Sequence, residues 1–265
     1  MNKQKYLLLS LAAIVVLFAS CSSEKKPEET AEQPAATTQQ AATPIDQATV
    51  GEVSGKVTFD GAKPKQARIM MDQDPVCVKK HTGPVLAEDN EVNGDGTLPN
   101  VFIFVKSGAE KYTFATPTDA ATLDQDGCMY KPHVLGIMTG QTLKVVSSDA
   151  TTHNIHPMPK DNREWNESQP PGAAPIEKTF ARSEVMIPVK CNQHPWMRAY
   201  VGVVSNPFYA VTGSDGTFTI KGLPPGDYTI EAWSAVGGGA GQTVDQKVTI
   251  APKESKKVDF TFKAS

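Results

Sequence analysis

The sequence contains, at residues 185–197, the stretch Val185-Met186-Ile187-Pro188-Val189-Lys190-Cys191-Asn192-Gln193-His194-Pro195-Trp196-Met197. Val185, Ile187, Val189 and Cys191 fall on alternate positions of it. Successive side chains of a β-strand point to opposite faces, so this period of two predicts a strand that turns the Cys191 sulfur inward with its apolar face. The stretch thus predicts a β fold in which a buried thiol is followed by an imidazole and a thioether.

These donor types indicate a particular metal. One cysteine and two histidines in a trigonal arrangement, with a weak axial methionine, are the ligand set of blue copper sites. The best candidate for the second histidine is His153, in Thr152-His153-Asn154-Ile155-His156, which follows a strand-like run over residues 143–147. The alternative is plain core packing, because a lone buried cysteine and a nearby methionine often serve only as apolar filling.

The segment Cys191-Asn192-Gln193-His194-Pro195-Trp196-Met197, with His153-Asn154-Ile155-His156 upstream, resembles the ligand loops of cupredoxins of the amicyanin and plastocyanin type. Amicyanins have the same spacing from Cys to His to Met and a Pro after the His. The resemblance covers roughly residues 126–204 and implies a Greek-key β-sandwich with one type 1 copper. The implied ligands are His153, Cys191, His194 and Met197. Asn154 would tie the two ligand loops together, and His156 would not be a ligand.

The number of histidines separates a redox carrier from a redox enzyme. The chain has five, His81, His133, His153, His156 and His194, and a copper oxidase or nitrite reductase would need several more beyond the blue site. We therefore expect an electron carrier that is not an enzyme and has no small-molecule substrate. In the family, electrons pass through the exposed edge of the histidine that corresponds to His194, which lies within an apolar surface patch. Pro195 and Trp196 are the candidates for that patch in this chain. Copper storage or delivery, and a cell-surface scaffold, stay open as alternatives.

From residue 50 onward the chain shows short alternating apolar runs separated by Gly and Pro turns, which predicts an all-β chain. Val101, Ile103 and Val105 alternate with Phe102 and Phe104, so both faces of that strand are expected to be covered.

A second β domain is indicated near the C-terminus. Residues 212–220 and 223–233 resemble a carboxypeptidase regulatory-like β-sandwich, whose opening strand resembles residues 55–61. The sequence therefore predicts an N-terminal β segment (50–110), a copper domain (111–205) and a second sandwich (206–265). Two alternatives stay open: the copper domain is inserted into the second sandwich, which then includes residues 50–110, or the two domains are consecutive.

The N-terminal residues have the pattern of an export signal. Lys3 and Lys5 precede an apolar run over residues 6–18, which predicts a signal peptide at 1–20. Phe18-Ala19-Ser20-Cys21 resembles a bacterial lipobox, which implies a lipid on Cys21, although an ordinary secreted protein is the alternative. Residues 21–49 are rich in Glu, Pro, Ala, Thr and Gln and predict a disordered tether. We expect the mature chain outside the cytoplasm, in the cell envelope and anchored to a membrane by lipid.

Two further cysteines, Cys77 and Cys128, are left for a disulfide, which an oxidising compartment favours. The alternative is a second metal site that also uses His81 and His133. The formal net charge of −3 is small for 265 residues and gives no indication of a nucleic-acid partner. The expected partners are redox proteins.

Overall fold

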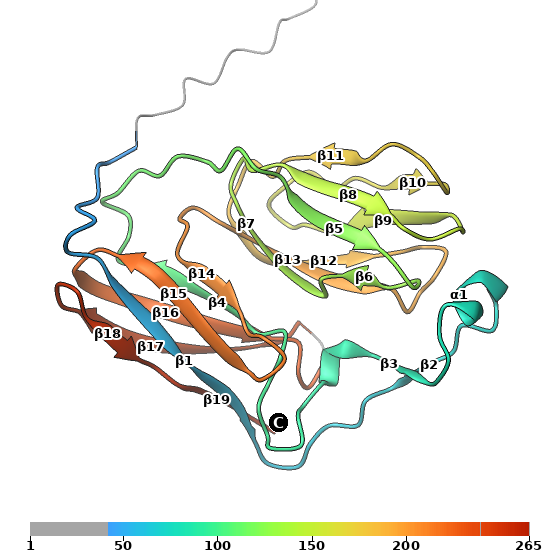
Figure 1. Ribbon diagram of the computed structural model, residues 1–265, viewed down its shortest axis with the longest axis horizontal. Helices are drawn as coiled ribbons and strands as arrows, with labels where there is room; N and C mark the ends of the chain where they lie inside the picture. The colour runs from blue at the N-terminus through green and yellow to red at the C-terminus, as the bar shows by residue number, and fades with distance from the viewer. Residues whose placement is uncertain (1–41, 239, 265) are drawn as a thin grey trace, which may run out of the picture. The chain divides into compact units, whose positions relative to one another are not determined.

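The computed structural model describes residues 42–238 and 240–264. The predicted signal peptide, the lipid attachment at Cys21 and the tether up to residue 41 lie outside the described residues. Apart from the short helices α1 (Pro75–Lys79) and η1 (Glu88–Asn90), the regular elements there are strands, which confirms the predicted all-β fold (Figure 1). No helix within those residues is long and apolar enough to cross a membrane.

The first sandwich contains the predicted copper loops. One sheet has five strands in the order β10 (Glu167–Gln169), β9 (His153–Pro157), β12 (Glu184–Lys190), β13 (Arg198–Val204) and β7 (Val134–Met138). The other has the order β11 (Ile176–Lys178), β8 (Leu143–Ser147), β5 (Ala121–Gln125) and β6 (Tyr130–Lys131). A core of buried side chains includes Leu123, Ile155 and Ile187 together with Cys191 and Met197, so the candidate ligands lie within the core of this sandwich.

The second sandwich also has two sheets. In one, β1 (Gly51–Asp60) pairs with β15 (Thr217–Leu223), β18 (Ser255–Lys257) and β19 (Phe260–Lys263). The other has the order β14 (Tyr209–Val211), β4 (Phe102–Ser107), β16 (Gly226–Ser234) and β17 (Gln242–Ile250). Its core contains Val53, Val57, Ile103, Ile230 and Phe260.

The second sandwich takes strands from both sides of the first in sequence. Figure 1 shows β1, in blue, beside the orange and red strands β15, β18 and β19. In the same way, β4 pairs with β14 and β16. The strands of the first sandwich, from β5 to β13, therefore lie in sequence between β4 and β14, both of which belong to the second.

Strand β4 packs on both faces, as its unbroken apolar sequence predicts. Val101, Ile103 and Val105 point into the second core, whereas Phe102 and Phe104 pack with Val134, Val204 and Trp233 at the contact with the first sandwich. Gly136 and Gly202 are cross-strand partners on β7 and β13, and a Cβ on either would come within 2.7 Å of the Phe102 ring. This glycine pair provides the recess that the ring fills.

Residues 61–97 run from the second sandwich to the ligand-loop end of the first. They contain the short pair β2 (Arg68–Ile69) and β3 (Val85–Leu86), with α1 between them. Asp74 caps α1 by accepting a hydrogen bond from the Val76 amide at 2.8 Å, and Pro75 occupies the first helical turn, where a missing N–H costs nothing. Met71 and Cys77 belong to the core of the first sandwich, so this segment covers one end of that core.

Two sequence predictions need correction. Val185 was expected to point inward, but it is 38% exposed. The register of β12 shifts between Glu184 and Ile187, and Met186 has a φ of +61°, so an irregularity in the strand turns Val185 outward. The predicted disorder up to residue 49 is also wrong at its end, because Ile45 packs against the second core and Thr43 hydrogen-bonds Thr113.

Candidate metal centre

Two loops bring the candidate ligands together. His153 is the first residue of β9, and Cys191, His194 and Met197 lie in the turn that joins β12 to β13. That turn is closed by backbone hydrogen bonds, from the Met197 amide to the His194 carbonyl at 2.9 Å and from the Cys191 amide to the Met197 carbonyl at 3.3 Å. The antiparallel pairing of β9 with β12 places the two loops at the same end of the sandwich.

His153, Cys191 and His194 form a group that could hold a metal ion. The Nδ1 atoms of the two histidines are 2.9 Å apart, and the Cys191 Sγ lies 3.8 Å from the His194 Nδ1. One donor atom from each residue lies within 4.8 Å of the others, and the three residues are 0%, 1% and 5% exposed. Two imidazole nitrogens and a sulfur that face one buried point fit a small thiophilic ion such as copper.

The other predicted residues take different positions. Met197 is fully buried in the same core as Cys191, in the loop that also carries His194. His156 hydrogen-bonds the side chains of Asn192 and Glu164 and does not belong to the three-donor group.

Asn154 connects the two loops. Its side-chain oxygen accepts a hydrogen bond from the Asn192 amide at 2.7 Å and lies 3.3 Å from the Cys191 sulfur. Its backbone amide points at the same sulfur at 3.5 Å, and its Nδ2 donates to Asn166 at 2.7 Å. Asn154 thus contacts the sulfur through two atoms, of which the backbone N–H is the one that can donate to a thiolate.

The electrostatics of the group favour a thiolate. Burial opposes ionisation of Cys191, but hydrogen bonds from His153 and from the Asn154 amide lower the pKa of the thiol to about 7. Burial likewise opposes protonation of His153, but hydrogen bonds to Asp149 and Cys191 raise the pKa of this imidazole to about 9. Because the thiolate is the form of cysteine that binds metals, Cys191 is prepared to act as a ligand near neutral pH.

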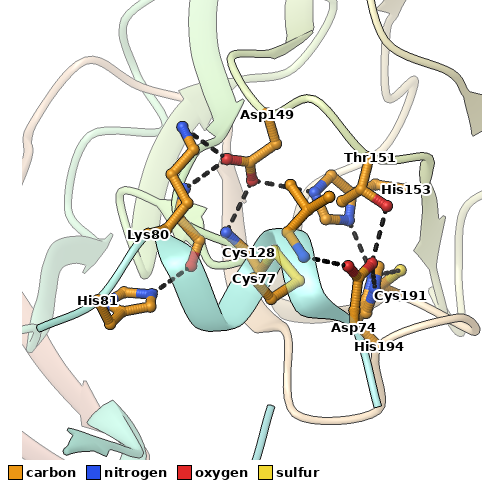
Figure 2. Close-up of a disulfide and its surroundings, with 12 residues drawn as sticks. Asp74, Cys77, Lys80, His81, Cys128, Asp149, Thr151, His153, Cys191 and His194 are labelled. Atoms are coloured by element: carbon orange, nitrogen blue, oxygen red, sulfur yellow. Dashed lines mark hydrogen bonds and ion pairs between the residues drawn. A yellow bond between two sulfur atoms is a disulfide. The ribbon is translucent and has the colours of Figure 1, made fainter. Parts of the chain in front are cut away.

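Each histidine of the group also contacts a carboxylate on its outer side, a contact that was not predicted from the sequence. His153 Nε2 lies 3.0 Å from Asp149 Oδ2, and His194 Nε2 lies 3.1 Å from Asp74 Oδ2 (Figure 2). Asp149 is four residues before His153, and this short spacing is a weak indication that the two side chains meet. Asp74, in contrast, is 120 positions from His194. The Asp74-Pro75 pair could have indicated a helix start, but nothing in the sequence indicates its contact with His194.

Cys77 and Cys128 are joined by a disulfide whose sulfurs are 2.04 Å apart. The alternative of a second metal site is therefore wrong for this structure, because both thiols are used. His81 hydrogen-bonds the Gly127 carbonyl at 2.7 Å, and His133 lies 3.2 Å from Asp89 Oδ1 and 3.6 Å from Glu88 Oε2.

The edge of His194 does not reach the surface, contrary to the expectation from the family. The residue is 5% exposed and its Nε2 faces Asp74. The reason is residues 61–97, whose α1 covers this end of the sandwich. Pro195 is exposed and Trp196 is half-buried, with its ring centroid 5.0 Å from that of His194 and its Nε1 donating to the Cys128 carbonyl at 3.0 Å.

Residues 195–258 match the family model described as polysaccharide lyase family 4, domain II. The match begins in the ligand loop and continues through β13 into the second sandwich. The resemblance of the C-terminal region to carboxypeptidase regulatory-like domains stays a prediction. A search of curated proteins gave no match.

Solved structures with similarity to the chain include several cupredoxins. A copper-containing nitrite reductase from Thermus scotoductus has a TM-score of 0.32 and 19% identity over 39% of this chain, which spans 25% of that enzyme. A purple cupredoxin from Nitrosopumilus maritimus has a TM-score of 0.27 and 22% identity, over 31% of this chain and 98% of its own. An amicyanin variant has a TM-score of 0.28 and 24% identity, and the match covers 32% of this chain and 81% of the amicyanin chain. Similarity at this level says nothing about the chemistry, which rests on the residues described above.

Proposed function

We propose that the chain is a blue-copper electron carrier in which His153, Cys191 and His194 hold one copper ion and Met197 is the weak fourth ligand. The observation that carries the proposal is the convergence of two histidine Nδ1 atoms and one cysteine sulfur at a buried point. Bound copper would supply a one-electron couple between Cu(I) and Cu(II). Thioether, thiolate and imidazole are ligands suited to both oxidation states.

The protein residues hold this site closed. Asn154 fixes the Cys191 sulfur, Asp149 fixes His153 from outside, and the core of the first sandwich surrounds Met197. A rigid, water-poor cage changes its geometry little when the charge of the ion changes, which is what transfer of single electrons requires. The outer nitrogens of both histidines face carboxylates, so the Nδ1 atoms are the ring nitrogens left to bind the ion.

The route to the surface that we propose runs through Trp196 rather than through the edge of His194. The Trp196 ring lies against that of His194 and also lines a surface cavity of about 460 Å³. Pro195, Met129 and the exposed Met70 line the same cavity. Charged and titratable side chains also line it, namely Arg68, Glu88, Asp89, His133 and Arg198. A surface next to the metal ligands that combines apolar and charged groups suits brief contact with a redox partner protein.

For the location, we propose that the predicted lipid on Cys21 attaches the protein to a membrane on the outer side of the cytoplasm. The disulfide between Cys77 and Cys128 supports an oxidising compartment. Replacement of Cys21 by Ser should release the protein from the membrane fraction. A variant that still sediments with membranes would require another anchor.

Copper titration followed by voltammetry tests the function. We expect one bound copper and a reversible one-electron wave. Rapid exchange of copper with a chelator and no reversible wave would indicate storage or delivery instead.

The route is tested by Trp196→Leu, with Trp165→Leu as the matched control. Trp165 is also half-buried, but its ring contacts the Lys178 ammonium, which lies 5.6 Å from the ring centroid. Trp196→Leu should slow electron exchange between protein molecules and leave the thiolate-to-copper absorption in place, whereas Trp165→Leu should change neither. Equal exchange rates in the two variants would refute the route.

A further inference from the structure

We propose that residues 74–80 form a clamp on the two histidine ligands, in which Asp74 positions His194 directly and Lys80 positions His153 through Asp149. The inference rests on the proposed copper site and adds positioning residues to it. These residues come from α1 and its two capping positions, outside both ligand loops. Figure 2 shows the clamp with its disulfide and the two histidines.

The first contact of the clamp is at the start of α1. Both carboxylate oxygens of Asp74 are used: Oδ1 accepts from the Val76 amide at 2.8 Å, and Oδ2 accepts from Thr151 Oγ1 at 2.8 Å and faces His194 Nε2 at 3.1 Å. Thr151 lies in the loop before His153. Asp74 therefore links three separate parts of the chain and has little freedom to leave His194.

The second contact is at the other end of α1. Lys80 Nζ lies 3.0 Å from Asp149 Oδ1, and Asp149 Oδ2 lies 3.0 Å from His153 Nε2. The Asp149 side chain is fully buried and also accepts hydrogen bonds from the Gly127 and Cys128 amides at 2.9 and 2.7 Å. The amides of Gly127 and Cys128, the Lys80 ammonium and the His153 ring thus surround the two carboxylate oxygens and hold Asp149 in place.

The disulfide fixes the middle of the clamp. Cys77 lies within α1, and its partner Cys128 donates its amide to Asp149 and accepts a hydrogen bond from Trp196. The helix is thus held at its start by His194 and Thr151, at its centre by a covalent bond and at its end by Asp149. A five-residue helix has little stability of its own, so these attachments determine where it lies.

The clamp has a direct consequence for the ligands. A carboxylate at Nε2 requires the hydrogen of a neutral imidazole to be on that nitrogen, which leaves the lone pair of Nδ1 free for a metal. Both histidines of the group face each other through Nδ1 and face a carboxylate through Nε2. The clamp therefore favours, for each imidazole in its neutral form, the tautomer that the metal needs. A metal ion would replace the hydrogen that one Nδ1 supplies to the 2.9 Å contact between the two rings. The negative charge of Asp74 favours the more positive oxidation state of a bound ion, whereas that of Asp149 is offset by Lys80.

The test compares Asp74→Asn with Asp72→Asn. Asparagine is also a good N-cap, so α1 should keep its start, but an amide NH₂ cannot accept the hydrogen of His194 Nε2. Asp72 is exposed and carries the same charge two positions away, which makes Asp72→Asn the matched control. Loss of an outer-shell partner typically weakens metal binding about 10–100-fold, and we expect this loss for Asp74→Asn alone.

The reduction potential gives a second readout. If the loss of affinity is tenfold greater for Cu(II) than for Cu(I), the potential should rise by about 59 mV, the value of a tenfold change for one electron. A copper affinity and a potential that are equal in Asp74→Asn and Asp72→Asn would overturn the clamp.

A third readout needs no metal. Nitrogen NMR of the metal-free protein should show His194 with its hydrogen on Nε2 in the wild type and in Asp72→Asn, and a loss of that preference in Asp74→Asn. A hydrogen on Nδ1 and none on Nε2 of His194 in the wild type would overturn the clamp even if copper binds. A wild type with the expected tautomer but without a thiolate-to-copper absorption would refute the proposed function and leave the clamp as a metal-free structural feature.

Discussion

Removal of the disulfide between Cys77 and Cys128 should destabilise the whole described chain as well as the clamp. The perturbation is the double variant Cys77→Ala/Cys128→Ala. Both residues are fully buried, and alanine avoids placing a hydroxyl in their apolar surroundings. The sequence separation of the two cysteines is 51, so the bond closes a long loop in the unfolded chain.

The expected magnitude follows from the entropy of that loop. In the chain-entropy model, opening a loop of this length lowers the free energy of unfolding by about 4 kcal/mol at 25 °C. With a urea dependence of about 2 kcal/mol per molar, the midpoint of unfolding should fall by about 2 M.

The assay is urea unfolding of the metal-free protein, so that copper binding does not contribute. Cys191→Ala is the control, because it also removes a buried sulfur but breaks no cross-link. Its effect should be clearly smaller than that of the double variant. A change below about 1 kcal/mol in the double variant would refute the reasoning, since the loop would then contribute little entropy to the unfolded state.

Two further predictions concern other parts of the fold. Gly202→Ala should lower the free energy of unfolding by about 1–3 kcal/mol, because the added Cβ would come 2.6 Å from the buried Phe102 ring. Gly83→Ala is the control: its added Cβ meets open space, so its free energy of unfolding should hardly change. Calorimetry of the two variants compares these effects. Burial lowers the pKa of His133, but the neighbouring Asp89 and Glu88 raise it, and the net shift is upward. The contribution of protonated His133 to the free energy of unfolding is therefore complete below about pH 6.5, and it is lost as the pH rises through the folded-state pKa. Urea unfolding at pH 6 and pH 8.5 should show a larger decrease for the wild type than for His133→Gln, and equal decreases would contradict the assignment.

The fold class and the group of candidate ligands could be predicted from the sequence because both depend on local patterns. The alternation in residues 187–191 directs Cys191 inward, and the structure places it there at 1% exposure. The double-sided burial of β4 follows from its unbroken apolar run in the same way. Val185 shows the limit of this reasoning, because one strand irregularity at Met186 reverses the direction of the preceding side chain.

The surroundings of the site could not be predicted, because they depend on contacts between distant residues. Asp74 reaches His194 from 120 positions away, as the N-cap of a helix of only five residues. The prediction of an exposed His194 edge was wrong for the same reason. The covering segment, residues 61–97, precedes the copper loops in sequence and contains no motif that indicates where it packs. Pairing of β1 with β15 and β19 likewise joins residues more than 150 positions apart.

The visible absorption of the purified protein with one equivalent of Cu(II) tests the central claim most directly. A trigonal site with a cysteine thiolate predicts an intense thiolate-to-copper charge-transfer band, present in the wild type and absent in Cys191→Ser. A wild type without the band, or a band that persists in Cys191→Ser, would contradict the assignment of His153, Cys191 and His194 as a blue copper site.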